Sequence, residues 1–149
     1  MPTSLCQIAV HIIFGTKRHR PLLSDDIHPY IHGIITNIKG IPIRINGTEN
    51  HIHILTMIPK DMSVSDFVRT IKANSSKWFK THSPHMEWQT GYAAFGVSKT
   101  NIQIVDTYIQ NQKEHHRKLS FAEEMNKYLM EMGAEDVYNE WFEDEETEG

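Results

Sequence analysis

Residues 41–57 decide the fold of this chain, and they read IPIRINGTENHIHILTM. Isoleucines occupy every second position over residues 41–46, which is the pattern of a strand with one buried face. Residues 47–50 are turn formers, and an alternating pattern resumes over residues 51–57. A connection this short joins neighbouring strands in antiparallel orientation, so the segment predicts a β-hairpin inside a sheet.

The second strand of this hairpin places two imidazoles on the same face. Because strand side chains alternate between faces, Ile52 and Ile54 point to one side of the sheet and His51 and His53 to the other. Imidazole is a common ligand of divalent cations. The chain holds ten His, so roughly 0.5–1 His-x-His pairs arise by chance. The pair by itself therefore fits a metal site and a solvated polar sheet face alike.

The rest of the sequence predicts further strands and helices before and after the hairpin. Residues 7–14 are rich in Ile and Val and predict a buried strand, and the aromatic residues 88–97 predict another. Predicted helices begin at the capping residues Ser24 and Ser63, at about Asn101, and at Ser120. We expect the first helix to end at Gly40, the third to run to His116 and the fourth to end near Gly133.

The order strand, helix, strand, strand, helix, strand defines the fold class. It predicts an α+β, ferredoxin-like (split βαβ) antiparallel sheet with helices on one face. Extra helices follow at the C-terminal end. Residues 1–140 are expected to form a single domain, and residues 141–149 an acidic tail.

Composition narrows the broad class. Of the 149 residues, 39% are hydrophobic and 23% charged, which fits a globular protein and excludes a disordered one. The apolar runs are too short to cross a bilayer, and the N-terminal residues show no signal-peptide pattern. A lone Cys6 fits a reducing compartment. We expect a cytoplasmic protein that does not contact membranes.

Charge is distributed unevenly along the chain. Residues 1–100 carry eleven Lys or Arg against six Asp or Glu, whereas residues 101–149 carry four against thirteen, giving the overall net charge of −4. A phosphate backbone responds to local positive potential and not to the net charge of the protein. The basic two-thirds of the chain can therefore face a polyanion.

A second segment, residues 108–112 with the sequence YIQNQ, carries a phenol and a carboxamide one helical turn apart. A carboxamide oxygen can join two imidazoles around a divalent cation, and a tyrosine beside that cation is a candidate nucleophile toward a phosphodiester. The spacing of Tyr108 and Gln112 is also, and more commonly, that of an amphipathic helix edge. The spacing of Tyr108 and Gln112 supports a functional site only because the chain also contains the histidine pair.

Taken together, these segments resemble the single-tyrosine HUH transposases. These are small bacterial insertion-sequence enzymes that move single-stranded DNA, and they have domesticated REP-associated relatives. Residues 50–55, NHIHIL, resemble the HUH motif, and residues 108–124 resemble the nucleophile helix. Residues 71–78 and 88–98 also resemble sequences of this family. One departure is residues 48–50, Thr-Glu-Asn, where many relatives have Met-Pro-Asn or Met-Pro-Asp.

The resemblance, which spans most of residues 7–133, implies a role for each matching residue. His51, His53 and Gln112 would be metal ligands, and Tyr108 the nucleophile that forms a covalent 5′-phosphotyrosine intermediate. The cofactor would be Mg²⁺ or Mn²⁺, since neutral ligands that leave open positions suit a phosphate-bridged ion. Imidazole would also accept Zn²⁺.

The partners implied by the resemblance are single-stranded DNA with an imperfect hairpin and a second copy of the chain in a homodimer. Candidate contacts to the DNA backbone lie in the loop after the first strand and on the second helix. For each of them, ordinary surface solvation explains the charge equally well. These residues are Lys17, Arg18, Arg20, Arg69, Lys72 and Lys77.

Three alternatives to a mobile transposase remain open at this point. The first is a domesticated REP-associated endonuclease that processes chromosomal hairpins. The second is a non-catalytic nucleic-acid-binding module, which would place exposed aromatic residues at the centre of the sheet. The third is a regulatory zinc-binding protein, which would need a fourth ligand and no neighbouring tyrosine.

Overall fold

The structure, a computed structural model, describes residues 4–82, 84–131 and 133–143. The chain divides into two units, Met1–Gln112 and Lys113–Gly149. Residues 144–149, which make up most of the predicted acidic tail, lie outside the described residues.

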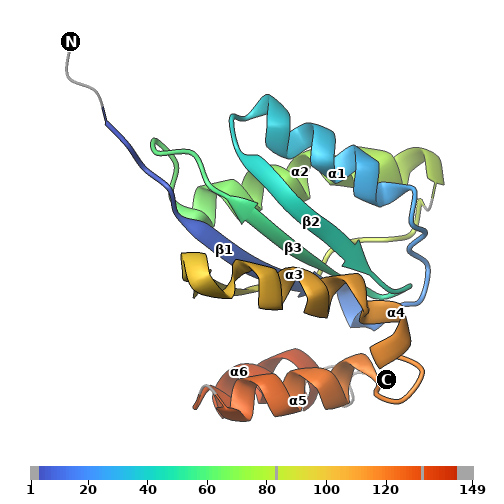
Figure 1. Cartoon of the computed structure of the whole chain (residues 1–149). Helices are drawn as coiled ribbons and strands as arrows, with labels where there is room; N and C mark the ends of the chain where they lie inside the picture. The colour runs from blue at the N-terminus through green and yellow to red at the C-terminus, as the bar shows by residue number, and fades with distance from the viewer. Residues whose placement is uncertain (1–3, 83, 132, 144–149) are drawn as a thin grey trace. The chain divides into compact units, whose positions relative to one another are not determined.

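A four-stranded antiparallel sheet with the order β2-β3-β1-β4 forms the first unit (Figure 1). With two helices between its strands, it has the βαββαβ connectivity of a ferredoxin-like fold, so the predicted fold class is confirmed. The strands are β1 (Ala9–Gly15), β2 (Ile41–Gly47), β3 (His51–Met57) and β4 (Ala93–Val97). The two helices are α1 (Ile27–Asn37) and α2 (Val64–His82).

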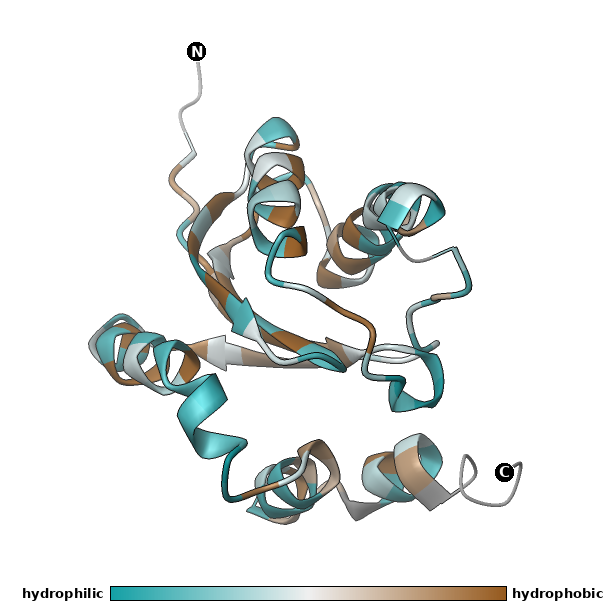
Figure 2. Ribbon diagram, turned by 90° about the vertical axis from the view of Figure 1, so that its right-hand side faces the viewer, coloured by the Kyte–Doolittle hydropathy of each residue, from teal (hydrophilic) through white to brown (hydrophobic). Residues whose placement is uncertain are grey.

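The two faces of the central strands have different partners. Side chains at even positions of β1 and β3, such as Ile12 and Ile54, which pair in register, belong to the hydrophobic core. That core is completed by α1 and α2, which lie together on one side of the sheet (Figure 2). Ile31 of α1 and Ile71 of α2 are fully buried in it. The odd positions face the other side.

Strand β4 is shorter than the sequence predicts, because residues 88–92 are held differently. The Lys72 ammonium on α2 donates to the carbonyl oxygens of Gln89, Thr90 and Gly91 at 2.8, 3.3 and 2.8 Å. Carbonyls that turn toward this ammonium do not pair with β1. Regular pairing therefore starts at Ala93, and Trp88 makes only an isolated bridge.

The helix predicted over residues 101–116 is divided. A 3-10 turn η2 (Lys99–Asn101) leads into α3 (Ile102–Gln110), and a short α4 (Gln112–His115) follows after Asn111. Asn111 has φ −94° and ψ 16°, outside the helical range. The side-chain amide of Asn46 donates to the carbonyl oxygens of Ile109 and Gln110. Those carbonyls would otherwise accept from the next helical turn, which explains why the helix breaks here.

The second unit is helical and contains α5 (Phe121–Glu131), α6 (Glu135–Tyr138) and a π-helical turn η3 (Asn139–Glu143). The predicted capping box of α5 is confirmed, since Ser120 and Glu123 exchange hydrogen bonds of 3.1 and 3.2 Å. The Phe142 ring packs against Phe121 and Tyr138 at centroid distances of 5.6 and 4.9 Å. No helix among the described residues combines the length and apolar character needed to cross a bilayer.

Two glycines near α1 have different environments. Helix α1 ends at Asn37, before the predicted Gly40, and Lys39 rather than Gly40 adopts the left-handed conformation, with φ 73°. A Cβ at Gly40 would lie 2.7 Å from Ile35 Cγ2 and 3.2 Å from a Phe67 ring carbon, whereas a Cβ at Gly33 would meet nothing within 4 Å. Gly40 is thus required by close packing, and Gly33 is not.

The same substitution should therefore have opposite effects at the two sites. We expect Gly33→Ala to raise the free energy of unfolding by about 0.5–1 kcal/mol, because alanine stabilises a helix interior. Gly40→Ala should lower it by about 1–3 kcal/mol through overpacking. Urea unfolding followed by circular dichroism measures both values, and equal effects at the two positions would contradict this packing.

Candidate active site on the histidine face of the sheet

The histidine pair lies at the centre of the sheet. Strand β3 runs between β1 and β2 and carries both His51 and His53, whose side chains are fully buried and whose ring centroids lie 5.2 Å apart. A buried imidazole needs partners for its ring nitrogens, since an unpaired polar atom in the interior is costly. The alternative of a solvated polar sheet face is thereby excluded.

Both ring nitrogens of His51 have polar partners. Its Nδ1 lies 2.9 Å from both Asn50 Oδ1 and Thr48 Oγ1. Its Nε2 lies 3.2 Å from Gln112 Oε1. Both amide oxygens can only accept, so the metal-free ring can donate to Asn50 from Nδ1 or to Gln112 from Nε2. When the proton sits on Nδ1, Nε2 has a lone pair on the side of Gln112 Oε1, and a cation beside both atoms would replace the Nε2 proton.

The chemistry of these donors fits a divalent metal ion. His51 Nε2 and Gln112 Oε1 lie 3.2 Å apart, close enough for both to bind one ion. With His53 as a third neutral ligand, further positions would stay open for phosphate oxygens or water.

Tyr108 lies on α3 beside this pair. Its ring centroid is 5.8 Å from that of His53, and the side chain is half-buried. The helix is held over the sheet by the Asn46 contacts described above and by the Arg44–Asp106 ion pair of 2.7 Å. The first unit thus brings together all four residues that the sequence predicted for the centre of the site.

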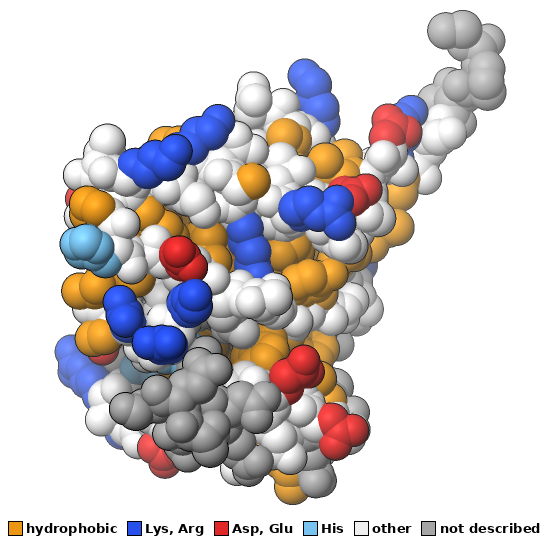
Figure 3. Space-filling model, turned by 180° about the vertical axis from the view of Figure 1, so that it is seen from behind, with side chains coloured by type: hydrophobic (Ala, Val, Ile, Leu, Met, Phe, Trp, Pro, Cys, Tyr) orange, Lys and Arg blue, Asp and Glu red, His pale blue; other side chains and the backbone are white. Residues whose placement is uncertain are grey.

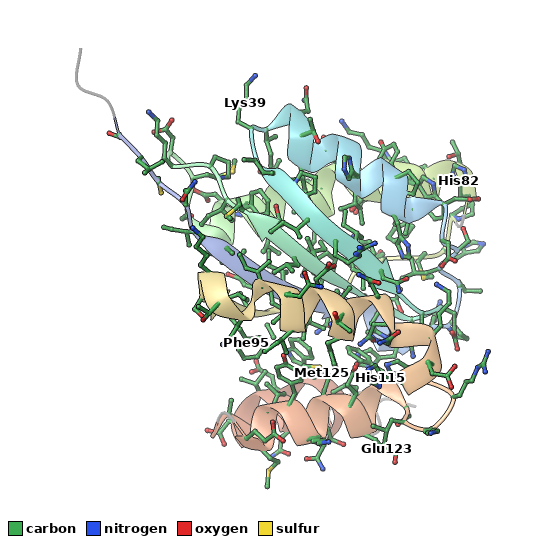
Figure 4. The ribbon with its side chains drawn as sticks, in the orientation of Figure 1. Lys39, His82, Phe95, His115, Glu123 and Met125 are labelled. Carbon is green, nitrogen blue, oxygen red and sulfur yellow. The ribbon has the colours of Figure 1, made fainter. Side chains whose placement is uncertain are left out.

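His11 of β1 belongs to the same cluster and was not predicted. Its Nε2 lies 2.9 Å from His53 Nδ1, and its ring centroid is 6.4 Å from that of Tyr108. Phe95 of β4, labelled in Figure 4, lies next to it at a centroid distance of 6.3 Å. The sequence offered one signal, a single histidine inside an otherwise apolar strand. His11, like His53, is at an odd-numbered position, and the odd-numbered side chains of both strands lie on the same face of the sheet.

The predicted basic residues of the first loop gather at one end of the site. Lys17, Arg18 and Arg20 line a hollow of about 220 Å³. In the view of Figure 3, Lys and Arg side chains are interspersed with apolar ones. The loop leaves β1 at Gly15, which pairs with His51. Arg18 has φ 59° and His19 φ 52°, a left-handed conformation that is uncommon for residues with a side chain and recurs at functional sites.

The predicted basic residues of α2 are less uniform. Arg69 and Lys72 line a second, larger hollow of about 580 Å³, and Arg69 pairs with Asp66 on the same helix at 2.9 Å. Lys72 is bound to the three carbonyls described above, and its burial lowers the pKa of its ammonium to about 8. Lys77 is exposed. Among these three, Lys72 has a clear role in holding residues 89–91.

The family of the chain emerges from comparison with known proteins. The chain matches the family model described as "Transposase IS200 like" over residues 4–112, a range that includes the whole histidine–tyrosine cluster. A search of curated protein sequences gives no match.

Two solved structures are similar to the chain. One is a protein assigned as a transposase from Deinococcus radiodurans R1, with a TM-score of 0.59 and 22% identity over 75% of this chain and 95% of that one. The other is a REP-associated tyrosine transposase bound to a REP hairpin, with a TM-score of 0.60 and 14% identity over 78% of this chain and 72% of that one. At these identities the likeness concerns the fold.

One further histidine of the basic loop has an unusual titration. Burial lowers the pKa of His19 to about 4, partly opposed by a hydrogen bond with Gln89. The folded protein therefore keeps this ring neutral between pH 6.5 and 4, while the unfolded chain takes up a proton there. Stability must accordingly fall as the pH drops through this window.

We expect the His19 ring to titrate in NMR with a midpoint near pH 4. The acid-induced loss of unfolding free energy between pH 6.5 and 4 should be roughly 1–2 kcal/mol smaller in His19→Gln than in the wild type, a discounted value because the ring is partly exposed. His32→Gln, an exposed substitution on α1, serves as the control. An unchanged pH dependence in His19→Gln would contradict the burial argument.

Proposed function

The chain belongs to the IS200-like transposase family, and we propose that it cuts and rejoins single-stranded DNA with Tyr108 as the nucleophile. The ligands of the required divalent cation would be His51, His53 and Gln112. The observation that carries this proposal is the convergence of a phenol and an imidazole–amide pair inside one unit. Tyr108 lies beside His53, and His51 Nε2 lies 3.2 Å from Gln112 Oε1.

The proposed reaction is a transesterification. The phenol oxygen of Tyr108 forms a bond to phosphorus while the bond from phosphorus to the 3′ oxygen breaks, and the phenol proton ends on that 3′ oxygen. The products are a 5′-phosphotyrosine and a free 3′-hydroxyl. Because the covalent link conserves the phosphodiester, a 3′-hydroxyl can reverse the step without ATP, which allows strand transfer as well as cutting.

The protein contributes position and electrostatics to this step. A bound Mg²⁺ or Mn²⁺ would act as a Lewis acid on a non-bridging phosphate oxygen. The half-buried Tyr108 is held in place by the attachment of α3 to β2, through Asn46 and the Arg44–Asp106 pair. Such fixed placement of a nucleophile contributes to the rate by removing the entropy of orientation.

The substrate is proposed to be a single-stranded DNA hairpin. One structural relative was solved with a REP hairpin bound, and the basic loop of this chain begins beside His51, where a scissile phosphate would lie. The central strands carry buried histidines on this face, whereas a base-stacking RNA-binding module would carry exposed aromatics. The homodimer and the cytoplasmic location expected from the sequence stay predictions.

The nucleophile can be tested by covalent capture. Incubation with single-stranded hairpin DNA and Mn²⁺ should give an adduct that resists denaturing electrophoresis. We expect no adduct with Tyr108→Phe, and a reduction of at least about 10-fold with His51→Ala or Gln112→Ala, because a lost metal ligand removes charge stabilisation. Tyr30→Phe, which removes an exposed phenol on α1, should match the wild type. An adduct that persists in Tyr108→Phe would refute this assignment.

The basic loop can be tested through salt dependence. If Lys17, Arg18 and Arg20 each contact a phosphate, replacing one of them with Gln should reduce the slope of log Kd against log salt by about 0.7–0.9. Fluorescence anisotropy with a labelled hairpin measures this slope. Lys60→Gln, beyond the opposite end of β3, provides the matched control. Equal slopes for all four variants would place the DNA elsewhere.

A further inference from the structure

Two buried histidines from neighbouring strands form a direct hydrogen bond beneath Tyr108. His11 Nε2 and His53 Nδ1 lie 2.9 Å apart, and the two rings stack at a centroid distance of 5.1 Å with 28° between their planes. Both side chains are almost completely buried. A contact this short between two imidazoles requires that one ring donates a proton to the other.

Strand register brings the two rings together. In the antiparallel pairing of β1 with β3, His11 stands opposite Leu55, and Ile13 stands opposite His53. His11 and His53 are therefore diagonal neighbours on one face of the sheet, within reach of each other's aromatic side chains. Because a central strand has little freedom to shift, the backbone itself sets this contact.

The bond has only one arrangement that leaves His53 able to bind a cation. If its Nδ1 carries the proton and donates to His11 Nε2, then its own Nε2 carries a lone pair that can form a ligand bond. If instead His11 donates, the neutral His53 ring must hold its proton on Nε2 and cannot bind a metal there. His51 has a separate set of Nδ1 contacts, with Asn50 and Thr48.

We propose that His11 is a positioning residue that locks His53 in the metal-binding tautomer and orientation by accepting its Nδ1 proton. This inference rests on the proposed function, in which His53 is a ligand. Each histidine of the pair then has its own outer partner: the Asn50–Thr48 turn for His51, and a third histidine from β1 for His53. Outer partners of this kind commonly affect metal affinity by 10–100-fold.

Two substitutions of His11 separate its hydrogen bond from its bulk. His11→Gln keeps an acceptor oxygen near the position of the ring Nε2, whereas His11→Phe keeps an aromatic ring of similar size and removes the acceptor. If the role is purely packing, Phe is the milder change; if it is acceptance of a proton, Gln is. The full-length protein is used throughout, and urea unfolding reports whether each variant is folded.

The first measurement uses Mn²⁺ alone, detected by electron paramagnetic resonance in the absence of DNA. We expect His11→Phe to bind Mn²⁺ about 10–100-fold more weakly than the wild type and His11→Gln to stay within about threefold. Covalent adduct formation should follow the same order, and excess Mn²⁺ should restore part of the activity of His11→Phe. A Mn²⁺ affinity unchanged in His11→Phe would overturn the proposal.

The second measurement reads the proton directly in the metal-free wild type. Long-range ¹H–¹⁵N correlation of the His53 ring should show a single tautomer with hydrogen on Nδ1, and His11→Phe should give a mixture of tautomers. A wild-type His53 that carries its proton on Nε2 would refute the inference even if the variants failed to fold.

The outcomes also distinguish this inference from the proposed function. If His51→Ala leaves Mn²⁺ affinity unchanged, the metal site itself is misassigned, whatever the state of His53. If His51→Ala weakens binding and His11→Phe does not, the metal site stands and only the role of His11 falls.

Discussion

The constraint on which the rest of this protein depends is the strict alternation of side chains in the central strands. One face of β1 and β3 is committed to the hydrophobic core under α1 and α2, so every odd-numbered side chain must face the other way. On β3 those side chains include two imidazoles, which are buried in the middle of the sheet and need partners for their nitrogens. A buried polar face is costly unless each atom has a partner, and the site is built from those partners.

Helix α3 is positioned by polar contacts with the same sheet. Asn46 donates to the last carbonyls of the helix, and Arg44 pairs with Asp106 at 2.7 Å. The first of these contacts also interrupts the helix at Asn111, so that a new turn begins at Gln112. One side chain of β2 therefore contributes to two properties at once. Asn46 holds the helix that carries Tyr108 in place. It also ends that helix just before Gln112, whose side-chain oxygen lies 3.2 Å from His51 Nε2.

The basic residues likewise divide into one that holds the backbone and a group that we propose contacts DNA. Lys72, although its sequence context suggests DNA binding, has its ammonium within hydrogen-bonding distance of three backbone carbonyls, and this contact shapes residues 89–91. The loop after β1 keeps Lys17, Arg18 and Arg20 around an open hollow, in a backbone conformation that residues with side chains rarely adopt. The low pKa of His19 leaves the positive potential of this loop to lysine and arginine at neutral pH.

Periodicity and caps in the sequence sufficed for the order of strands and helices along the chain, both faces of β3 and the starts of α2 and α5, because these depend on neighbours within a few residues. They also singled out His51, His53, Tyr108 and Gln112. What the sequence could not show was set by contacts between residues far apart in the chain. The shortened β4, the break at Asn111 and the pairing of His11 with His53 each require a register between strands, or a side chain reaching another element, that no local pattern encodes. Tertiary structure alone decided these, because a hydrogen bond across 42 positions exists only once the sheet has formed.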